Sequence, residues 1–124
     1  MSAALTVGIV LVSHSAELAT GAAHLAGQVS GGTVTIIAAG GTDDGDLGTS
    51  AAKVEHALGQ AESGAGVVVL PDLGSAVLTV RAVLENHNDA TSVLLADAPF
   101  VEGAVAATVT AAAGGDGLDV PARG

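Results

Sequence analysis

One histidine of this chain stands where a reactive side chain would be expected. His14 lies in the segment VLVSHSAELATG (residues 10–21), between two serines, after an apolar run and before a helical pattern. Neutral imidazole is a nucleophile near pH 7, since its reference pKa is about 6.5. The other histidines, His24, His56 and His87, fall on polar faces or ends of predicted helices. His14 is therefore the candidate nucleophile, although a histidine that only hydrogen-bonds at a turn would occupy the same position.

An aspartate is the second candidate for chemistry. Asp72 begins the segment DLGSAV (residues 72–77), which follows another apolar run. A carboxylate bonded to one ring nitrogen of a histidine fixes the tautomer and leaves the other nitrogen free to attack. We expect Asp72 to orient His14, with Asp97 a weaker candidate for the same role. An exposed aspartate in a turn is the alternative interpretation of Asp72.

Several predicted helix starts surround these two residues. Ser13 or Ser15 can cap the helix that follows His14. In DLGSAV, Gly74 permits a close backbone approach and Ser75 stands at a predicted N-cap, while the segment GTSAAKV (residues 48–54), which contains Thr49, gives a third start. Helix N-termini favour anions. These residues therefore predict a phosphoryl-binding site that needs no arginine.

The elements that must position this site follow from four apolar runs. They are LTVGIVLV (5–12), TVTIIAA (33–39), GVVVLP (66–71) and TSVLLAD (91–97). None alternates apolar with polar residues, which is typical of parallel strands buried on both faces. Helical patterns fill the gaps, so we expect βαβ units. The prediction is an α/β fold, a three-layer αβα sandwich around a mainly parallel four-stranded sheet, with residues 118–120 as a possible short fifth edge strand.

The predicted helices each carry an apolar stripe that should face the sheet. The chain of 124 residues is expected to form a single domain, residues 1–124. In an open α/β sheet, ligands gather beyond the carboxyl ends of the strands, where His14 and Asp72 are predicted to lie. The expected stripes are Leu18, Ala22, Leu25 and Val29; Val54, Ala57, Leu58 and Ala61; Ala76, Val77, Val80, Val83 and Leu84; and Val101, Val105 and the alanines up to residue 113.

Composition excludes several classes of function. The formal net charge is −10, with Lys53, Arg81 and Arg123 as the cations, so binding to nucleic acid or to an anionic membrane surface is not expected. A partner protein with a basic face would instead be attracted. Cysteine is absent and aromatic residues make up 1%. No leader or membrane span is recognisable, and we expect a cytoplasmic protein.

Other motifs of chemistry are missing. The sequence contains neither GxxxxGK[ST] nor GxGxxG, and no paired His/Cys spacing predicts zinc. The segment TDDGDLG (42–48) lacks the spacing of a calcium loop and is interpreted as a solvated acidic loop. No nucleophile-elbow glycines flank a serine, which argues against a hydrolase. We therefore expect no metal and no directly bound cofactor.

Taken in order, five segments resemble a known family. They are VSHS (12–15), AAGG (38–41), GTS (48–50), LPDLGSAVLT (70–79) and APFVEGAVAATVTAA (98–112). This combination resembles DhaM, the family of phosphotransfer subunits of the phosphoenolpyruvate-dependent dihydroxyacetone kinase. Its domain is related to the mannose-type enzyme IIA of the sugar phosphotransferase system. The resemblance covers nearly the whole chain.

The resemblance implies a specific role for this chain. His14 would accept a phosphoryl group from the carrier protein HPr and pass it to ADP held on the DhaL subunit. The ATP so formed would phosphorylate dihydroxyacetone on the DhaK subunit. The matching D-x-G-S pattern would place Asp72 beside His14. The family is homodimeric, which suits the apolar surplus of the chain.

Two other functions stay open at this point. Sugar-transporting relatives have a longer segment and a different glycine pattern after the third-strand aspartate, so DLGSAV favours the kinase branch over a sugar-permease IIA domain. A regulatory module that binds a partner according to its phosphorylation state is the third possibility. Some relatives carry HPr-like and enzyme I-like domains after this one, so here we expect the donor to be a separate protein.

Overall fold

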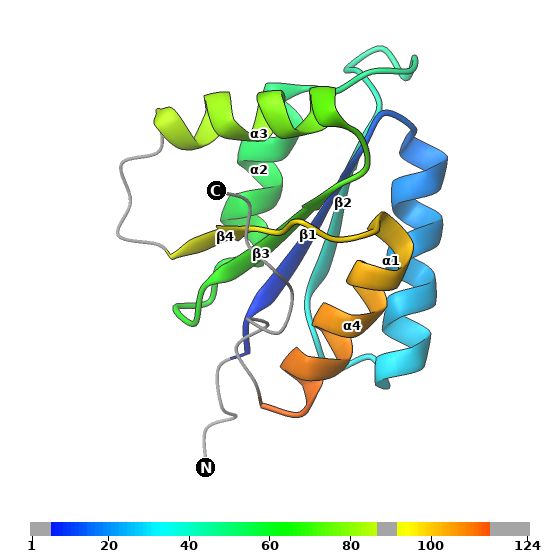
Figure 1. The fold of residues 1–124 in the computed structure, drawn as a ribbon, viewed down its shortest axis with the longest axis vertical. Coiled ribbons are helices and arrows are strands. Elements are labelled where there is room, and N and C mark those ends of the chain that lie inside the picture. The colour runs from blue at the N-terminus through cyan, green and yellow to red at the C-terminus, as the bar shows by residue number, and fades with distance from the viewer. Residues whose placement is uncertain (1–5, 87–91, 115–124) are drawn as a thin grey trace.

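Four strands alternate with four helices, as the pattern of apolar runs predicts (Figure 1). The computed structural model describes residues 6–86 and 92–114. The elements are β1 (Gly8–Ser13), α1 (Ala16–Ser30), β2 (Ile36–Gly40), α2 (Ala51–Ala61), β3 (Val67–Pro71), α3 (Gly74–Glu85), β4 (Val93–Leu95) and α4 (Phe100–Ala112). The predicted α/β class is confirmed.

The strands form one parallel sheet in the order β2-β1-β3-β4. Strand β1 is central, and its partners in register include Ile9 with Val68 and Ser13 with Gly40. The chain leaves β1 toward β2 on one side and returns through α2 to β3 on the other. The connection that leaves β1 and the connection that leaves β3 therefore run to opposite sides, β1 being followed by β2 and β3 by β4. Such a switch point opens a crevice at the carboxyl edge of a sheet, and both β1 and β3 end there.

Helices cover both faces of the sheet, which gives the predicted three layers (Figure 1). Helices α1 and α4 pack side by side on one face and share a core with Ile9, Leu11 and Leu70. Helices α2 and α3 cover the other face, where they pack against Val10, Val12 and Val69 of the sheet. Every residue of β1 is buried. A strand covered on both faces requires the continuous apolar run that predicted it.

The apolar stripes of α2 and α3 are confirmed, whereas that of α1 is confirmed at Ala22 and wrong at Leu18, Leu25 and Val29. Helix α1 turns small residues, Ala19, Ala22 and Ala26, to the core and leaves Leu18, Leu25 and Val29 about half exposed. In α4 the expected alanines are buried and Val105 packs against the core, whereas Val101 is exposed, so its expected contribution is wrong. Small side chains let two neighbouring helices lie close to the sheet and to each other, which the larger side chains would prevent. The buried residues of α4 are Gly103, Ala104, Ala107, Thr108 and Ala111.

A glycine at the end of β2 sets the distance between this strand and the start of α1. A Cβ on Gly40 would lie 2.6 Å from the carbonyl oxygen of Ser15 and 2.7 Å from Cα of Ala16. Both neighbours are backbone atoms that a side chain cannot push aside. Gly40 therefore allows the loop after β2 to lie against the backbone that follows His14.

Two predictions fall on segments that the structure does not describe. The possible fifth strand at residues 118–120 and the polar helix end around His87 lie outside the described residues. Within the described ranges, none of the helices combines the length and the apolar character needed to cross a bilayer.

Candidate functional site

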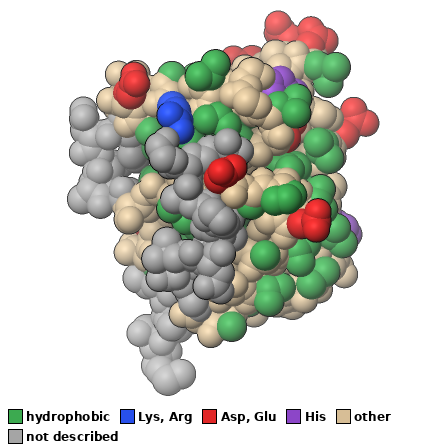
Figure 2. Space-filling view, viewed as in Figure 1, with side chains coloured by type: hydrophobic (Ala, Val, Ile, Leu, Met, Phe, Trp, Pro, Cys, Tyr) green, Lys and Arg blue, Asp and Glu red, His purple; other side chains and the backbone are tan. Residues whose placement is uncertain are grey.

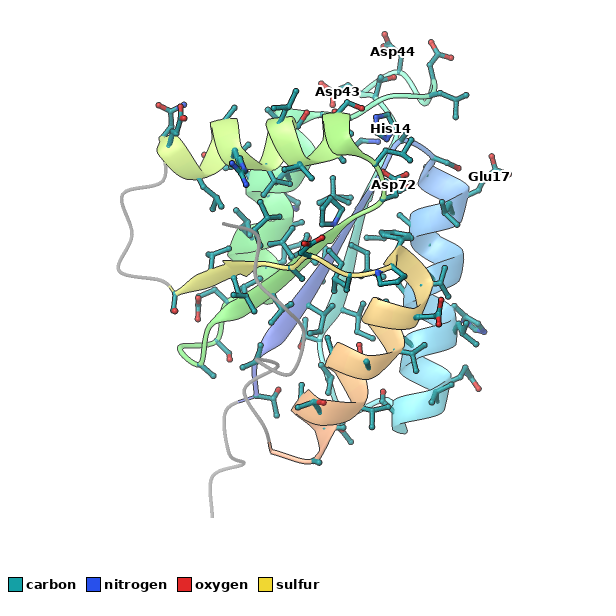
Figure 3. The ribbon with its side chains drawn as sticks, viewed as in Figure 1. His14, Glu17, Asp43, Asp44 and Asp72 are labelled. Carbon is teal, nitrogen blue, oxygen red and sulfur yellow. The ribbon has the colours of Figure 1, made fainter. Side chains whose placement is uncertain are left out.

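His14 lies at the carboxyl end of the central strand, between the last residue of β1 and the first turn of α1 (Figure 3). Its side chain is 23% exposed. The loop that carries Asp43 and Asp44 lies on one side of it, and Asp72 lies below it at the end of β3. The ring therefore stands at the edge of the switch-point crevice, between Asp72 and the loop that follows β2 (Figure 3).

Asp72 holds His14 by two separate hydrogen bonds. Its Oδ2 accepts the backbone N–H of His14 at 3.0 Å, and its Oδ1 lies 2.9 Å from the ring Nδ1. The backbone N–H of Asp72 donates in turn to the carbonyl oxygen of Val12 at 2.9 Å. The carboxylate therefore fixes both the main chain and the ring of His14. The alternative interpretation of Asp72 as an exposed turn aspartate is wrong, because its side chain is 9% exposed.

The hydrogen bonds keep this carboxylate ionised. Burial raises the pKa of Asp72, but the backbone N–H and ring of His14 and the hydroxyl of Ser13 outweigh it and lower the pKa below its ordinary value. An ionised carboxylate can only accept hydrogen bonds. The proton between Asp72 and His14 must therefore sit on Nδ1.

The opposite ring nitrogen points at the first turn of α3, where Nε2 contacts the hydroxyl of Ser75. With the proton of the neutral ring on Nδ1, Nε2 carries a lone pair and the hydroxyl of Ser75 donates to it. The N-cap of α3 is Leu73, so the expectation that Ser75 caps this helix is wrong. Ser75 instead turns its hydroxyl to the ring, and the first N–H groups of α3 have no side-chain cap.

The two serines that flank His14 have different roles. Ser15 caps α1, because its Oγ accepts the backbone N–H of Leu18 at 3.1 Å. Ser13 is fully buried; its hydroxyl donates to Oδ2 of Asp72 at 2.8 Å and accepts the backbone N–H of Ser15 at 3.0 Å. Ser13 is therefore a buried link between the start of α1 and the carboxylate of Asp72.

The structure gives Thr49 and Gly74 surroundings that do not depend on the phosphoryl binding predicted for them. The hydroxyl of Thr49 pairs with that of Thr79 at 2.7 Å, and Thr79 also donates to the carbonyl oxygen of Ser75 at 3.3 Å. This contact joins the loop before α2 to the turn of α3 that carries Ser75. Gly74 is the first residue of α3, and a Cβ there would meet no atom within 4 Å. A close backbone approach therefore does not require glycine at this position.

Two backbone groups of the site were not foreseen from the sequence. Gly48 N–H donates to the carbonyl oxygen of His14 at 2.8 Å, and Gly41 N–H donates to that of Ser13 at 3.1 Å. Lys53 fastens the same region, since its Nζ donates to the carbonyl oxygen of Gly40 at 3.0 Å. The glycine-rich stretch after β2 was the available signal. Its amides, rather than its side chains, hold the reactive segment.

The remaining candidates lie apart from this arrangement. Asp97 is exposed and follows β4, which is separated from β1 by β3 in the sheet order. His24 and His56 are exposed on α1 and α2, as expected. Among the residues described, no three His, Asp or Glu side chains gather in a group that could hold a metal ion.

Two hollows of the described surface lie beside α2, and neither is lined by His14. One lies along α2 and is lined by Ala52, Glu55, His56, Gly59 and Gln60. Another borders β2 between α1 and α2. His14 lies outside these two hollows, and its side chain is 23% exposed.

The chain is similar to components of the phosphotransferase system. A family model described as "EIIA-man: PTS system fructose IIA component" matches residues 8–119. The chain is 43% identical over 89% of its length to a Pantoea ananatis protein named "PEP-dependent dihydroxyacetone kinase, phosphoryl donor subunit DhaM", but spans 24% of that protein. It is 36% identical to a Listeria innocua protein, "PEP-dependent dihydroxyacetone kinase 2, phosphoryl donor subunit DhaM", over 83% of this chain and 84% of that one.

A solved structure has the same fold over nearly its full length. The crystal structure of EF1359, described as a protein of unknown function, superposes with a TM-score of 0.79 at 30% identity. The match covers 97% of this chain and 98% of that one.

Proposed function

Because the chain belongs to the EIIA-man family of phosphotransferase-system components, we propose that it is a phosphoryl carrier of the DhaM type with His14 as the phosphorylated residue. It accepts the group from phosphorylated HPr and passes it to ADP on a DhaL subunit. The ATP formed there serves a DhaK subunit that phosphorylates dihydroxyacetone. The names of the DhaM relatives support this branch of the family. The carrier works in the cytoplasm as a homodimer.

One observation carries the proposal: Asp72 takes Nδ1 of His14 and leaves Nε2 facing the first turn of α3. The ring is thereby held in the tautomer that a nucleophile needs, with its lone pair on the exposed side. The same role is played by the aspartate of hydrolytic triads. We therefore assign the phosphoryl group to Nε2.

The phosphoryl group passes from donor to acceptor through His14 in two displacement steps, and neither step needs a cofactor. The lone pair of Nε2 attacks phosphorus, the bond between phosphorus and the donor atom of HPr breaks, and its electron pair returns to that atom. The proton on Nδ1 stays with His14, and Asp72 stabilises the positive charge that develops on the ring as the new bond forms. In the second transfer, an oxygen of ADP attacks the same phosphorus and Nε2 leaves with its electron pair.

The first turn of α3 receives the phosphoryl group. The hydroxyl of Ser75 rotates from Nε2 to a phosphoryl oxygen, and α3 begins at this point without a side-chain cap on its first N–H groups. Backbone amides at a helix N-terminus stabilise phosphate without a cationic side chain. Gly74 adds no side chain that would cover them. Ser13, Ser15 and Thr49 support this cradle indirectly, through the contacts described above.

Phosphoryl transfer in a reconstituted system tests the proposal. Phosphoenolpyruvate, enzyme I and HPr should label the wild-type chain once, with an acid-labile and alkali-stable phosphate. His14→Ala should keep the fold and take up no label, while His24→Ala and His56→Ala serve as matched controls that label normally. Labelling of His14→Ala at another residue would overturn the assignment.

The acceptor separates this function from its alternatives. The family description as a fructose IIA component favours a sugar-permease IIA domain as the second candidate. Discharge of the labelled chain by ADP-loaded DhaL supports the carrier of dihydroxyacetone kinase, and discharge by a sugar-specific IIB domain supports the permease branch. A labelled chain that neither discharges, but that binds a transcription factor or transporter, would be a regulatory module.

A further inference from the structure

One lysine of this acidic chain contacts the backbone of the sheet. Lys53 and Arg81 are the Lys and Arg side chains of the described residues, and Figure 2 shows how sparse such side chains are beside the acidic ones on one face of the molecule. Lys53 is partly buried, and its Nζ donates to the carbonyl oxygen of Gly40 at 3.0 Å. Because lysine ammonium groups usually extend into water, this contact indicates a structural task.

The register of the sheet explains why Gly40 needs this partner. Gly41 donates its N–H to the carbonyl oxygen of Ser13, so Gly41 faces β1. Successive residues of a strand turn their N–H and C=O groups to opposite sides, so the carbonyl group of Gly40 faces away from β1. Strand β2 is at the edge of the described sheet, and no strand of that sheet lies on its outer side to donate. Gly40 is buried, where a carbonyl group without a donor is costly, and Lys53 supplies the donor.

The side chain of Lys53 also closes the base of a loop. Residues 41–50, which we call the β2–α2 loop, follow Gly40 directly and end at Ser50, the N-cap of α2. Lys53 lies in the first turn of α2, so its bond to Gly40 joins the two ends of this loop. Its backbone N–H donates to Oγ of Ser50 at 3.2 Å, and that hydroxyl donates to Oδ1 of Asp43 at 2.6 Å. Lys53 is thus bonded to the strand end by its side chain and to the loop through its backbone.

The β2–α2 loop holds the main chain at the reactive histidine. Gly41, at its start, donates to the carbonyl oxygen of Ser13 at 3.1 Å. Gly48, near its end, donates to the carbonyl oxygen of His14 at 2.8 Å. Asp72 holds the same main chain from β3, and Figure 3 shows the ring of His14 between this loop and Asp72. Because the two glycine amides come from opposite ends of the loop, both contacts depend on the loop staying closed.

We infer that Lys53 is a positioning residue for phosphoryl transfer at His14. The inference rests on the proposed function and deepens it. The ammonium group of Lys53 keeps the β2–α2 loop closed, and the amides of Gly41 and Gly48 then keep Nε2 of His14 in line with the incoming phosphorus. Lys53 acts through these backbone contacts, since the hydrogen-bond partner of its Nζ among the described residues is Gly40. A displacement of about 1 Å at a reacting atom can reduce a rate on the order of a hundredfold.

The kinetic test measures charging of the intact chain by phosphorylated HPr. Lys53→Met keeps an unbranched stem and removes the donor, so kcat should fall about tenfold while KM for phosphorylated HPr stays unchanged. Lys53→Arg keeps a charged donor and should recover kcat to within about threefold of the wild type. Lys53→Gln, whose amide is too short to reach Gly40, repeats the test where Lys53→Met does not fold.

A second measurement follows the loop without any transfer of phosphate. Amide hydrogen exchange, read by NMR, should become faster at Gly41 and Gly48 in Lys53→Met, because these amides lose their partners when the loop opens. The amide of Asp72 donates to the carbonyl oxygen of Val12 between β3 and β1, so its exchange should stay unchanged. Lys53→Arg should restore the protection of both glycine amides.

Two controls separate positioning from charge and from stability. Arg81→Met removes the other cation of the described residues, and Val83→Ala removes buried apolar volume at the far end of α3. Both should charge with the kcat of the wild type, although Val83→Ala lowers the melting temperature.

Three results would overturn the inference. They are a wild-type kcat in Lys53→Met, a loss confined to KM, which would mean that Lys53 contacts the donor, and a low kcat with unchanged exchange at Gly41 and Gly48. A wild-type chain that takes up no phosphoryl group contradicts the proposed function instead, and the exchange measurement then still decides whether Lys53 closes the loop.

Discussion

His14 and Asp72 are 58 positions apart in the sequence and are joined by two hydrogen bonds, one to the backbone N–H of His14 and one to its ring. The two strands that carry them are neighbours in the sheet and end at the same edge. A single carboxylate therefore fixes where the ring stands and which of its nitrogens holds the proton. Reactivity at Nε2 should depend on this one side chain.

We expect Asp72→Asn to fold and to accept the phosphoryl group more slowly. The replacing amide is uncharged and carries donors as well as an acceptor, so it neither holds Nδ1–H as firmly nor stabilises the charge on the phosphorylated ring. Loss of an orienting or proton-handling group commonly reduces rates on the order of a hundredfold. Quench-flow labelling with phosphorylated HPr measures the rate, and Asp97→Asn is the control. An unchanged rate would transfer the orienting role to other groups.

The stability of the chain should depend on the ionisation of Asp72. Its pKa is lowered in the folded protein, so the unfolded chain binds this proton more tightly. The stabilisation is then complete above the unfolded pKa, which is about 3.9, and is lost as the pH falls through the lower folded value. Urea unfolding of wild type and Asp72→Asn across pH 3–7 checks this.

The difference in free energy of unfolding between the two proteins should be constant at neutral pH and shift against the wild type below about pH 4. The other carboxyl groups are common to both chains and cancel in this comparison. A difference that does not change with pH would show that Asp72 ionises equally well in the unfolded chain.

Ser13→Ala should destabilise the fold and also slow the charging of His14. The buried hydroxyl accepts the N–H of Ser15 and donates to Asp72, and its removal leaves a buried donor without its partner. Such a loss costs about 1–3 kcal/mol. Ser15→Ala is the comparison, because it removes a helix cap, worth about 1 kcal/mol, without touching the carboxylate. Equal charging rates for the two variants would contradict a link from Ser13 to the ring.

Thr49→Val and Thr79→Val should act through one shared interaction. Their hydroxyls bond to each other, so each single change breaks the same contact. A double-mutant cycle in free energy of unfolding should give a coupling of about 0.5–1.5 kcal/mol. Charging should change little in either variant. A large loss of charging with Thr49→Val alone would restore the direct phosphate contact that the sequence suggested for Thr49.

Gly40→Ala should be strongly destabilising, because its methyl group would overlap the backbone at Ser15 and Ala16. The chain must separate β2 from the start of α1, and overpacking of this kind costs about 1–3 kcal/mol or more. Gly59→Ala in α2 is the matched control: its methyl group meets no atom within 4 Å, and alanine favours the helix by up to about 1 kcal/mol. Thermal unfolding should therefore move in opposite directions for the two variants.

The sequence is sufficient to predict the class of fold and the meeting of His14 with Asp72, because both follow from local rules. Continuous apolar runs require a covered parallel sheet, and residues after such strands share one edge. The face of α1 was predicted wrongly because periodicity alone does not say whether Leu18 and Leu25 or Ala19 and Ala26 face the core. Close packing of α1 against α4 selects the small residues, and that choice depends on tertiary contacts.

The details of the site were harder to predict for a similar reason. Ser75 was expected to cap α3, but the helix begins at Gly74 and the hydroxyl of Ser75 contacts the ring instead. The partner of Thr49 comes from α3, thirty residues further along the chain. The amides of Gly41 and Gly48 reach carbonyl groups beside His14 through the path of a loop. Motif spacing contains no information about that path.

The backbone that carries His14 is already held by hydrogen bonds from Asp72, Gly41 and Gly48 before any partner arrives. Moving the hydroxyl of Ser75 aside is the only rearrangement that the proposed transfer demands of these residues. The rate of phosphoryl transfer through the carrier is then set by how often the donor and the acceptor meet it in the right orientation. Internal motion of the carrier contributes little to that rate. A cell would adjust this rate most directly through the concentrations of the donor and acceptor proteins.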